Sequence, residues 1–195
     1  MKRTVKNIEY ILIFLIACLS AWTVYAQSLT FTPLIDYSYQ TEIAYRMYVG
    51  EMPYRDFWLI LSPGVYWILA IMMKLAGGYA HWIPLAFMCG ISFSIVLLTY
   101  AALRRLTTHP VLIIVLLTLL VSAGNAIVLV PNYDVAASGA IVISVLWFIT
   151  LWQQPKTPAW QWFLSGMLAF VPCLFKQNIG VAYTATMIGT LGGMS

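Results

Sequence analysis

A succession of long apolar runs, interrupted only briefly by polar residues, is the feature that most constrains this chain. A bilayer core about 30 Å thick needs roughly 20 apolar residues for one helix. Of the 195 residues, 62% are hydrophobic and 8% are charged, whereas a soluble domain carries roughly 25% charged residues. Because the runs are continuous and do not alternate with polar residues, they favour helices over a barrel. The sequence therefore predicts an all-α fold, a polytopic transmembrane helical bundle.

The apolar run at 59–77 differs from the others, because Pro63 and Gly64 lie near its start and Lys74 near its end. Its apolar core is too short to cross a bilayer, so we expect it to lie along the surface or to re-enter. The segment at about 29–81 is then a juxtamembrane loop with surface helices. The expected single domain, 1–195, has membrane helices at about 8–28, 82–103, 110–130, 135–152, 160–175 and 178–195.

Basic residues predict the orientation of the bundle, since they collect on the cytoplasmic side. The N-terminal MKRTVK places the N-terminus in the cytoplasm. If 59–77 does not cross, Arg104–Arg105 and Lys156 also return to the cytoplasm; if it crosses, both lie outside, against the rule. We therefore expect 29–81 to be extracytoplasmic. The N-terminal segment also resembles a secretory signal, but its apolar run can nearly span by itself and is expected to remain as the first helix.

The loop contains a concentration of carboxylates, since Ile35–Trp58 (IDYSYQTEIAYRMYVGEMPYRDFW) holds four of the six acidic residues. A helix is expected from Asp36 to about Val49, with its tyrosines at the headgroup level and Glu42 paired with Arg46. Asp36 has two interpretations. It is either the N-cap of this helix, or a carboxylate beside the membrane whose raised pKa suits a general base.

The order of features in residues 1–105 resembles the first part of the GT-C superfamily of membrane glycosyltransferases, which includes protein O-mannosyltransferases and aminoarabinose transferases. These features are one membrane helix, an Asp soon after it, a tyrosine-rich helix, GEMPYRDF, SPGVYWILAIMMKLAGG and a helix that ends in Arg-Arg. The rest of the chain matches only by pattern. The resemblance implies that loop helices lie along the membrane and that Asp36 activates the acceptor. Many relatives carry a second carboxylate there, but Tyr37 follows Asp36 in this chain.

Four further residues are candidates for the same site. Asp134 is interpreted either as a cap of the helix that follows or as a second catalytic carboxylate. Arg55 either pairs with Asp56 in an exposed turn or binds the donor phosphate. Lys176 interrupts two apolar runs, either in a plain hairpin or as a phosphate ligand. Lys74 either snorkels to the headgroups or is a weaker phosphate ligand.

Other residues are assigned structural roles. Cys18, Cys89 and Cys173 lie within apolar runs without metal or redox spacing, so we expect small buried hydrophobes. His81 and His109 are isolated and no metal site is expected, so a divalent metal is unsupported by the sequence. The net charge of +4 does not indicate nucleic-acid binding, because the basic residues flank apolar runs. The tryptophans near run ends are expected to form interface belts: Trp22, Trp58, Trp82, Trp152 and Trp160.

The resemblance implies an integral-membrane enzyme that moves a sugar from a polyprenyl-phosphate-linked donor to a glycan, lipid or protein acceptor on the extracytoplasmic face. No other cofactor is expected, and a bacterial plasma membrane is the expected location. The last run ends at LGGMS without a polar flank, which indicates a truncated GT-C module that need not be active alone. The alternatives are a transporter or flippase, which would place charges inside helices, and a non-catalytic assembly subunit.

Overall fold

The computed structural model describes residues 2–30, 34–125, 133–154 and 156–192. Within these residues every regular element is an α-helix, which confirms the predicted all-α class. The helices are α1 (Lys2–Thr30), α2 (Leu34–Tyr48), α3 (Gly64–Ala76), α4 (Trp82–Leu106), α5 (Pro110–Asn125), α6 (Tyr133–Trp152), α7 (Ala159–Phe175) and α8 (Gln177–Gly192).

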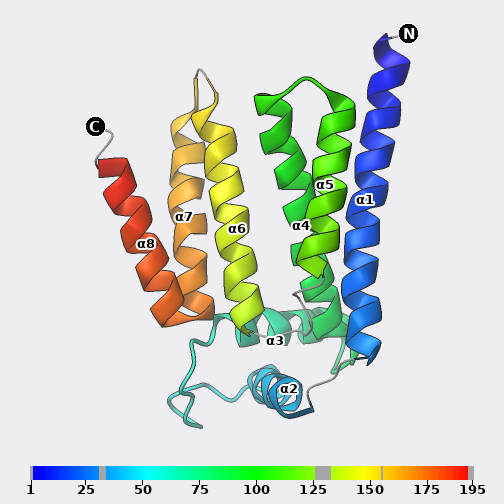
Figure 1. The fold of residues 1–195 in the computed structure, drawn as a ribbon. Coiled ribbons are helices and arrows are strands. Elements are labelled where there is room, and N and C mark those ends of the chain that lie inside the picture. Colours follow the sequence, from blue (N-terminus) through cyan, green and yellow to red (C-terminus); the bar gives the residue numbers. More distant parts are fainter. Residues whose placement is uncertain (1, 31–33, 126–132, 155, 193–195) are drawn as a thin grey trace.

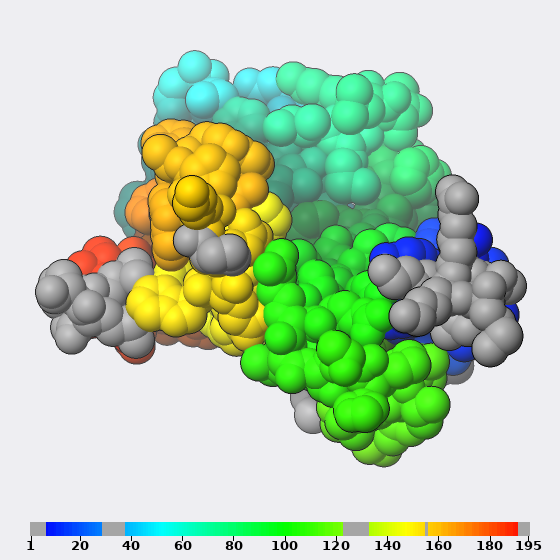
Figure 2. All heavy atoms as spheres, turned by 90° about the horizontal axis from the view of Figure 1, so that it is seen from above, coloured from blue at the N-terminus to red at the C-terminus, as the bar shows by residue number. Residues whose placement is uncertain are grey.

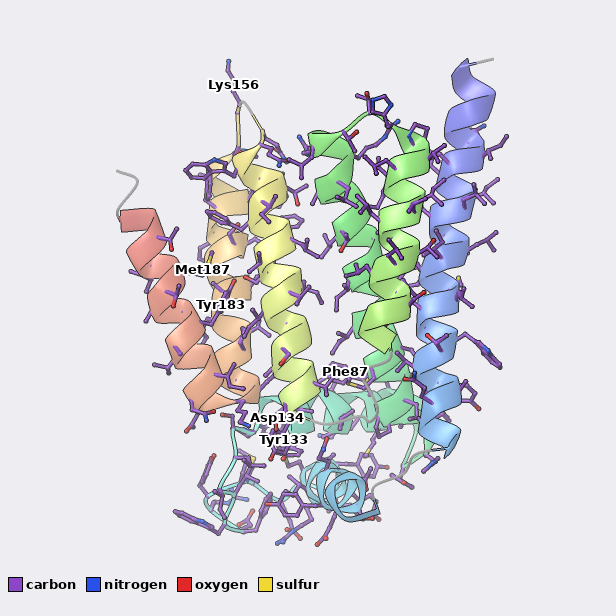
Figure 3. All side chains as sticks on the ribbon, viewed as in Figure 1. Phe87, Tyr133, Asp134, Lys156, Tyr183 and Met187 are labelled. Carbon is purple, nitrogen blue, oxygen red and sulfur yellow. The ribbon has the colours of Figure 1, made fainter. Side chains whose placement is uncertain are left out.

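Six of these helices form a bundle, and two lie across one end of it (Figure 1). The bundle contains α1 and α4 to α8, while α2 and α3 form a layer at the end where α1 finishes. The N-terminus and the α4–α5 connection lie at the opposite end, as does Lys156 (Figure 3). Seen from that opposite end, the cyan and teal spheres of α3 and the loop before it extend beyond the bundle (Figure 2). The helical layer after the first helix was expected from the sequence.

Three helices in the described residues are long and apolar enough to cross a membrane: Asn7–Ser28, Trp82–Leu106 and Tyr133–Trp152. The apolar segments Pro110–Ser122 and Ala159–Phe175 are shorter. Large apolar side chains cover the outside of the bundle and include Phe14, Leu119 and Phe163. A soluble protein rarely exposes so much contiguous apolar surface. The chain is therefore an integral membrane protein.

The helix α3 lies across the bundle end because its sequence favours a short helix with one buried face. Pro63 precedes its first residue, and Gly77 ends it in the left-handed conformation (φ 78°) that glycine adopts without steric cost. A side chain at Gly64 would collide with α7, since a Cβ there would lie 2.4 Å from the Leu174 carbonyl oxygen. The buried face consists of Val65, Tyr66, Leu69, Ala70 and Met73.

The helix α2 packs on α3 through an aliphatic face, and its ion pair corrects one expectation. Ala44 is buried in this face, whereas the neighbouring Tyr45 is exposed. The predicted pair of Glu42 with Arg46 is wrong, because the Arg46 Nε atom lies 2.5 Å from the Glu51 Oε2 atom instead. Gly50 has a positive φ, which turns the chain back beneath Arg46 and places Glu51 there. In Figure 1, α2 lies on the side of α3 away from the bundle.

The cysteines are less buried than the sequence predicts. Cys18 is exposed, and Cys89 and Cys173 are partly exposed. The reason is that every bundle helix presents an outer side, where an apolar position is not a buried position. The prediction that these cysteines are buried is therefore wrong.

The connection between α7 and α8 is a single residue, Lys176, which joins Phe175 to Gln177. The Lys176 N–H donates to the Pro172 carbonyl at 2.8 Å, and the Lys176 carbonyl accepts the Gly180 N–H at 2.8 Å. So tight a joint brings the two helices into backbone contact. A Cβ at Gly180 would lie 2.2 Å from the backbone nitrogen of Cys173.

We expect Gly180→Ala to lower the free energy of unfolding by about 1–3 kcal/mol, the usual cost of forcing extra atoms into a packed contact. Gly189→Ala is the matched control on the same helix, because a Cβ there meets nothing within 4 Å. It should leave stability unchanged or raise it by up to about 1 kcal/mol through helix propensity. Thermal unfolding of both variants in one detergent measures the difference. Equal unfolding temperatures would contradict the close contact of α7 and α8.

Candidate functional site

Two of the predicted site residues, Asp134 and Lys176, form an ion pair between the Asp134 Oδ1 atom and the Lys176 Nζ atom. The ammonium group also lies 5.5 Å from the centre of the Tyr133 ring, within cation–π range. Both Tyr133 and Asp134 lie where the bundle meets the α2–α3 layer (Figure 3). We call this group of three residues the Asp134–Lys176 site.

The local fold explains why these two side chains meet. Asp134 is in the first turn of α6, where the helix dipole favours a negative charge. Lys176 follows the last residue of α7 with an extended backbone (φ −148°, ψ 110°), which ends that helix at the joint. The side chains retain 42% and 24% of their exposure respectively. Both side chains therefore keep exposed surface, although the Asp134 Oδ1 atom itself is buried.

Side chains from several helices surround this site. The buried Phe175 ring, next to Lys176, makes an edge-to-face contact with Phe87 of α4, with ring centres 6.3 Å apart. The buried Gln40 of α2 lines a small cavity together with Phe87 and with Ala136 of α6. The buried side of α2 thus reaches the start of α6 through the Gln40 amide. The elements that converge here are α2, α3, α4, α6 and the α7–α8 joint.

The predicted base, Asp36, belongs to the first turn of α2, which begins at Leu34, so the interpretation of Asp36 as the N-cap is wrong. The Asp36 side chain lies outside the described part of the structure. Along the helix it precedes the buried Gln40 by four positions, which is about one turn. Its role as a base stays a prediction.

Arg55 forms an ion pair with Asp56, as in the turn interpretation, with its Nη2 atom 2.6 Å from the Asp56 Oδ2 atom. The hydrogen bond from Arg55, with a second from the Met52 N–H, lowers the pKa of Asp56 to about 2. Asp56 in turn raises the pKa of Arg55. Asp56 therefore stays ionised at neutral pH, and any phosphate that binds Arg55 must compete with it.

Lys74 is not close to Lys176. It lies exposed in the last turn of α3, whereas the first residue of that helix, Gly64, contacts α7 near the Asp134–Lys176 site. At a rise of about 1.5 Å per residue, Lys74 lies about 15 Å further along α3 than Gly64. The structure thus joins Asp134 with Lys176 and separates Lys74 from them.

An apolar cavity of about 240 Å³ lies between α1, α4, α5 and α6. Its few polar wall atoms include the hydroxyls of Ser20 and Ser92, which hydrogen-bond to each other at 2.7 Å. Ser138 and Val142 of α6 also line it. Asp134 precedes Ser138 by one helical turn on the same stripe of α6. The charged site and the apolar cavity are therefore neighbours along one helix.

The sequence did not reveal a buried ionic network at the other end of the bundle. Glu9 is only 4% exposed, yet its carboxylate accepts hydrogen bonds from Tyr100 and Arg104, both at 3.1 Å. Arg104 also donates to the Thr108 carbonyl. An ionisable residue within a predicted membrane helix requires a partner. Glu9, in the first predicted membrane helix, could therefore have indicated the network.

Comparison of the chain with protein-family models, with curated proteins and with solved structures found no match. Among the residues that the structure describes, no three His, Cys, Asp or Glu side chains gather as a metal site would require.

Proposed function

We propose that this chain is a glycosyltransferase of the GT-C type, which moves a sugar from a polyprenyl-phosphate-linked donor to an acceptor at the extracytoplasmic face. The observation that carries the proposal is the Asp134–Lys176 ion pair beneath an apolar cavity, at the end of the bundle covered by α2 and α3. Asp36 belongs to that layer. A lysine for a phosphate, a carboxylate for a hydroxyl and an apolar space for a lipid chain are the parts that this reaction requires.

In the proposed reaction an acceptor hydroxyl oxygen attacks the anomeric carbon of the sugar, on the face opposite the phosphate. The bond between that carbon and the phosphate oxygen breaks, and polyprenyl phosphate leaves with the electron pair. The acceptor proton passes to the carboxylate of Asp36 as general base. Lys176 stabilises the negative charge on the leaving phosphate. The products are the glycosylated acceptor and the lipid phosphate.

The other candidate residues differ in their proposed roles. Asp134 is the partner of Lys176 before a phosphate binds. Arg55 is a secondary phosphate ligand, since it is exposed in the loop but already bound by Asp56. Lys74 is omitted because it lies at the far end of α3 from the site. The cavity above Asp134 accommodates part of one lipid chain, since an apolar cavity of about 150 Å³ already holds a benzene ring.

A transporter or flippase is less well supported, although a buried charge exists in the bundle. Glu9 is bonded to Tyr100 and Arg104 and does not line the cavity between the helices. A transport pathway would place ionisable groups along such a cavity. The charged residues of the described bundle instead lie toward its two ends.

Cysteine accessibility tests the orientation that the proposal needs. In a variant without the three natural cysteines, single cysteines replace Asp56, Tyr79, Asn178, Arg105 or Lys156. A membrane-impermeant thiol reagent on intact bacteria should label the first three positions and spare the last two. Permeabilised cells provide the control, because all five should then react. Labelling of only positions 105 and 156 in intact cells would place the site in the cytoplasm and contradict extracytoplasmic transfer.

A further inference from the structure

The Lys176 side chain starts from a backbone that cannot shift independently of two helices. Its N–H and its carbonyl are both bonded, to Pro172 of α7 and to Gly180 of α8. Gly180 leaves no room for a side chain between those helices. Only the flexible four-carbon stem of the lysine can therefore move the ammonium group from one partner to another.

In the described part of the chain, Asp134 is the only ion-pair partner of Lys176. An ammonium group has three donors, so one carboxylate oxygen does not satisfy it completely. Both side chains are partly exposed, although the Asp134 Oδ1 atom in the pair is itself buried, and a pair that remains this close to solvent contributes only modestly to stability. A second anion can therefore take the lysine at small cost.

When the ion pair separates, the Asp134 carboxylate keeps a favourable environment. Asp134 lies in the first turn of α6, where the helix dipole continues to favour its charge. The ammonium also remains close to the Tyr133 ring, which attracts a cation. Both partners therefore keep a favourable environment when they separate.

We propose that Asp134 and Lys176 form an exchangeable ion pair, in which Asp134 competes with the phosphate of the lipid carrier and so promotes its release. This inference rests on the proposed function. The donor is a phosphodiester with one negative charge, whereas the lipid phosphate that leaves is a monoester with a charge approaching −2 at neutral pH. The product therefore binds Lys176 more tightly than the donor does. A competing carboxylate at Lys176 favours release of that product.

The test measures binding of dodecyl phosphate, a single-chain phosphate monoester, to the full chain in maltoside detergent by phosphorus NMR titration. Asp134→Asn should tighten binding about fivefold, because it removes a competitor of the strength usual for an exposed ion pair. Lys176→Gln should weaken it by at least the same factor. Asp134→Glu keeps the charge and should bind as the wild type does. Lys74→Gln is the matched lysine control and should have no effect.

The two proposals fail in different ways. If Asp134→Asn weakens binding or leaves it unchanged while Lys176→Gln weakens it, Lys176 is a phosphate ligand and the exchange is overturned. If Lys176→Gln binds as tightly as the wild type, the phosphate site itself is wrong, and the exchange fails with that part of the proposed function. A purely structural role for Asp134 predicts weaker binding of dodecyl phosphate in the Asn variant. The direction of the change in affinity therefore distinguishes the exchange from a structural role.

Discussion

Asp36→Asn should reduce sugar transfer by about 10²–10⁴-fold, the range that a positioned general base contributes. Asp36 is the third residue of α2 and not its cap, and asparagine has nearly the same size and shape as aspartate, so this substitution removes the base with little change in packing. The assay uses membranes that contain the chain, with polyprenyl-phosphate-linked mannose, glucose and aminoarabinose tested in turn as donors. The measured quantity is the rate at which radiolabelled sugar leaves the lipid carrier.

Two further variants separate the alternatives for Asp36. Glu42→Gln is the matched control on α2, because Glu42 is exposed and makes no ion pair within the described residues. It should leave transfer unchanged. Asp36→Ala and Asp36→Asn should both lower stability by about 0.3–1 kcal/mol if the carboxylate stabilises the first turn of α2 through the helix dipole. Full transfer by Asp36→Asn, together with a loss of stability in both variants, would leave Asp36 only a structural role in the first turn of α2.

Arg104→Met should lower the free energy of unfolding by about 3–5 kcal/mol, because it removes the cation that pairs with a buried carboxylate. The Glu9 side chain is 4% exposed and its Oε2 atom lies 3.1 Å from Arg104. Arg105→Met is the matched control, since it removes an equal charge from the adjacent, exposed position. The control should change stability by less than about 0.5 kcal/mol. Unfolding by sodium dodecyl sulfate in mixed micelles measures both.

A double substitution shows whether the loss of stability in Arg104→Met comes from the unpaired Glu9 charge that it leaves behind. Glu9→Leu combined with Arg104→Met should recover most of the lost stability, since no uncompensated charge is left in the apolar interior. If Arg104→Met unfolds at the same detergent ratio as Arg105→Met, the pair does not hold α1 against α4. The α1–α4 contact would then depend on apolar packing alone.

Much of the fold follows from local sequence. Continuous apolar runs predict helices because a lipid environment leaves the backbone no other partners, and the described helices other than α2 fall on those runs. Pro63, Gly64 and Lys74 also predict that the segment after α2 does not span, and α3 does lie across the bundle end. Exact helix ends were harder to predict. Lys176 alone connects two helices that were expected to be separated by a longer break.

The candidate site was only partly predictable. The sequence identified Asp134 and Lys176 as two separate candidates, one catalytic and one for phosphate, whereas the structure places them in contact. It assigned Arg46 to Glu42, a neighbour on the helix, whereas a turn at Gly50 brings Glu51 to it. A choice among several possible charge partners depends on distances across the fold, and helical periodicity contains no such distances.

Sequence alone therefore decided that this chain enters a membrane, where most of its helices run and which segment lies across the end of the bundle, because burial of apolar residues and satisfaction of backbone hydrogen bonds are local requirements. Only the tertiary structure decided which charges meet. Glu9 and Arg104 are 95 positions apart in the chain, and Asp134 meets Lys176 only because α6, α7 and α8 return to the same end of the bundle. Ionic contacts require a separation of a few ångströms, and helix packing sets that separation.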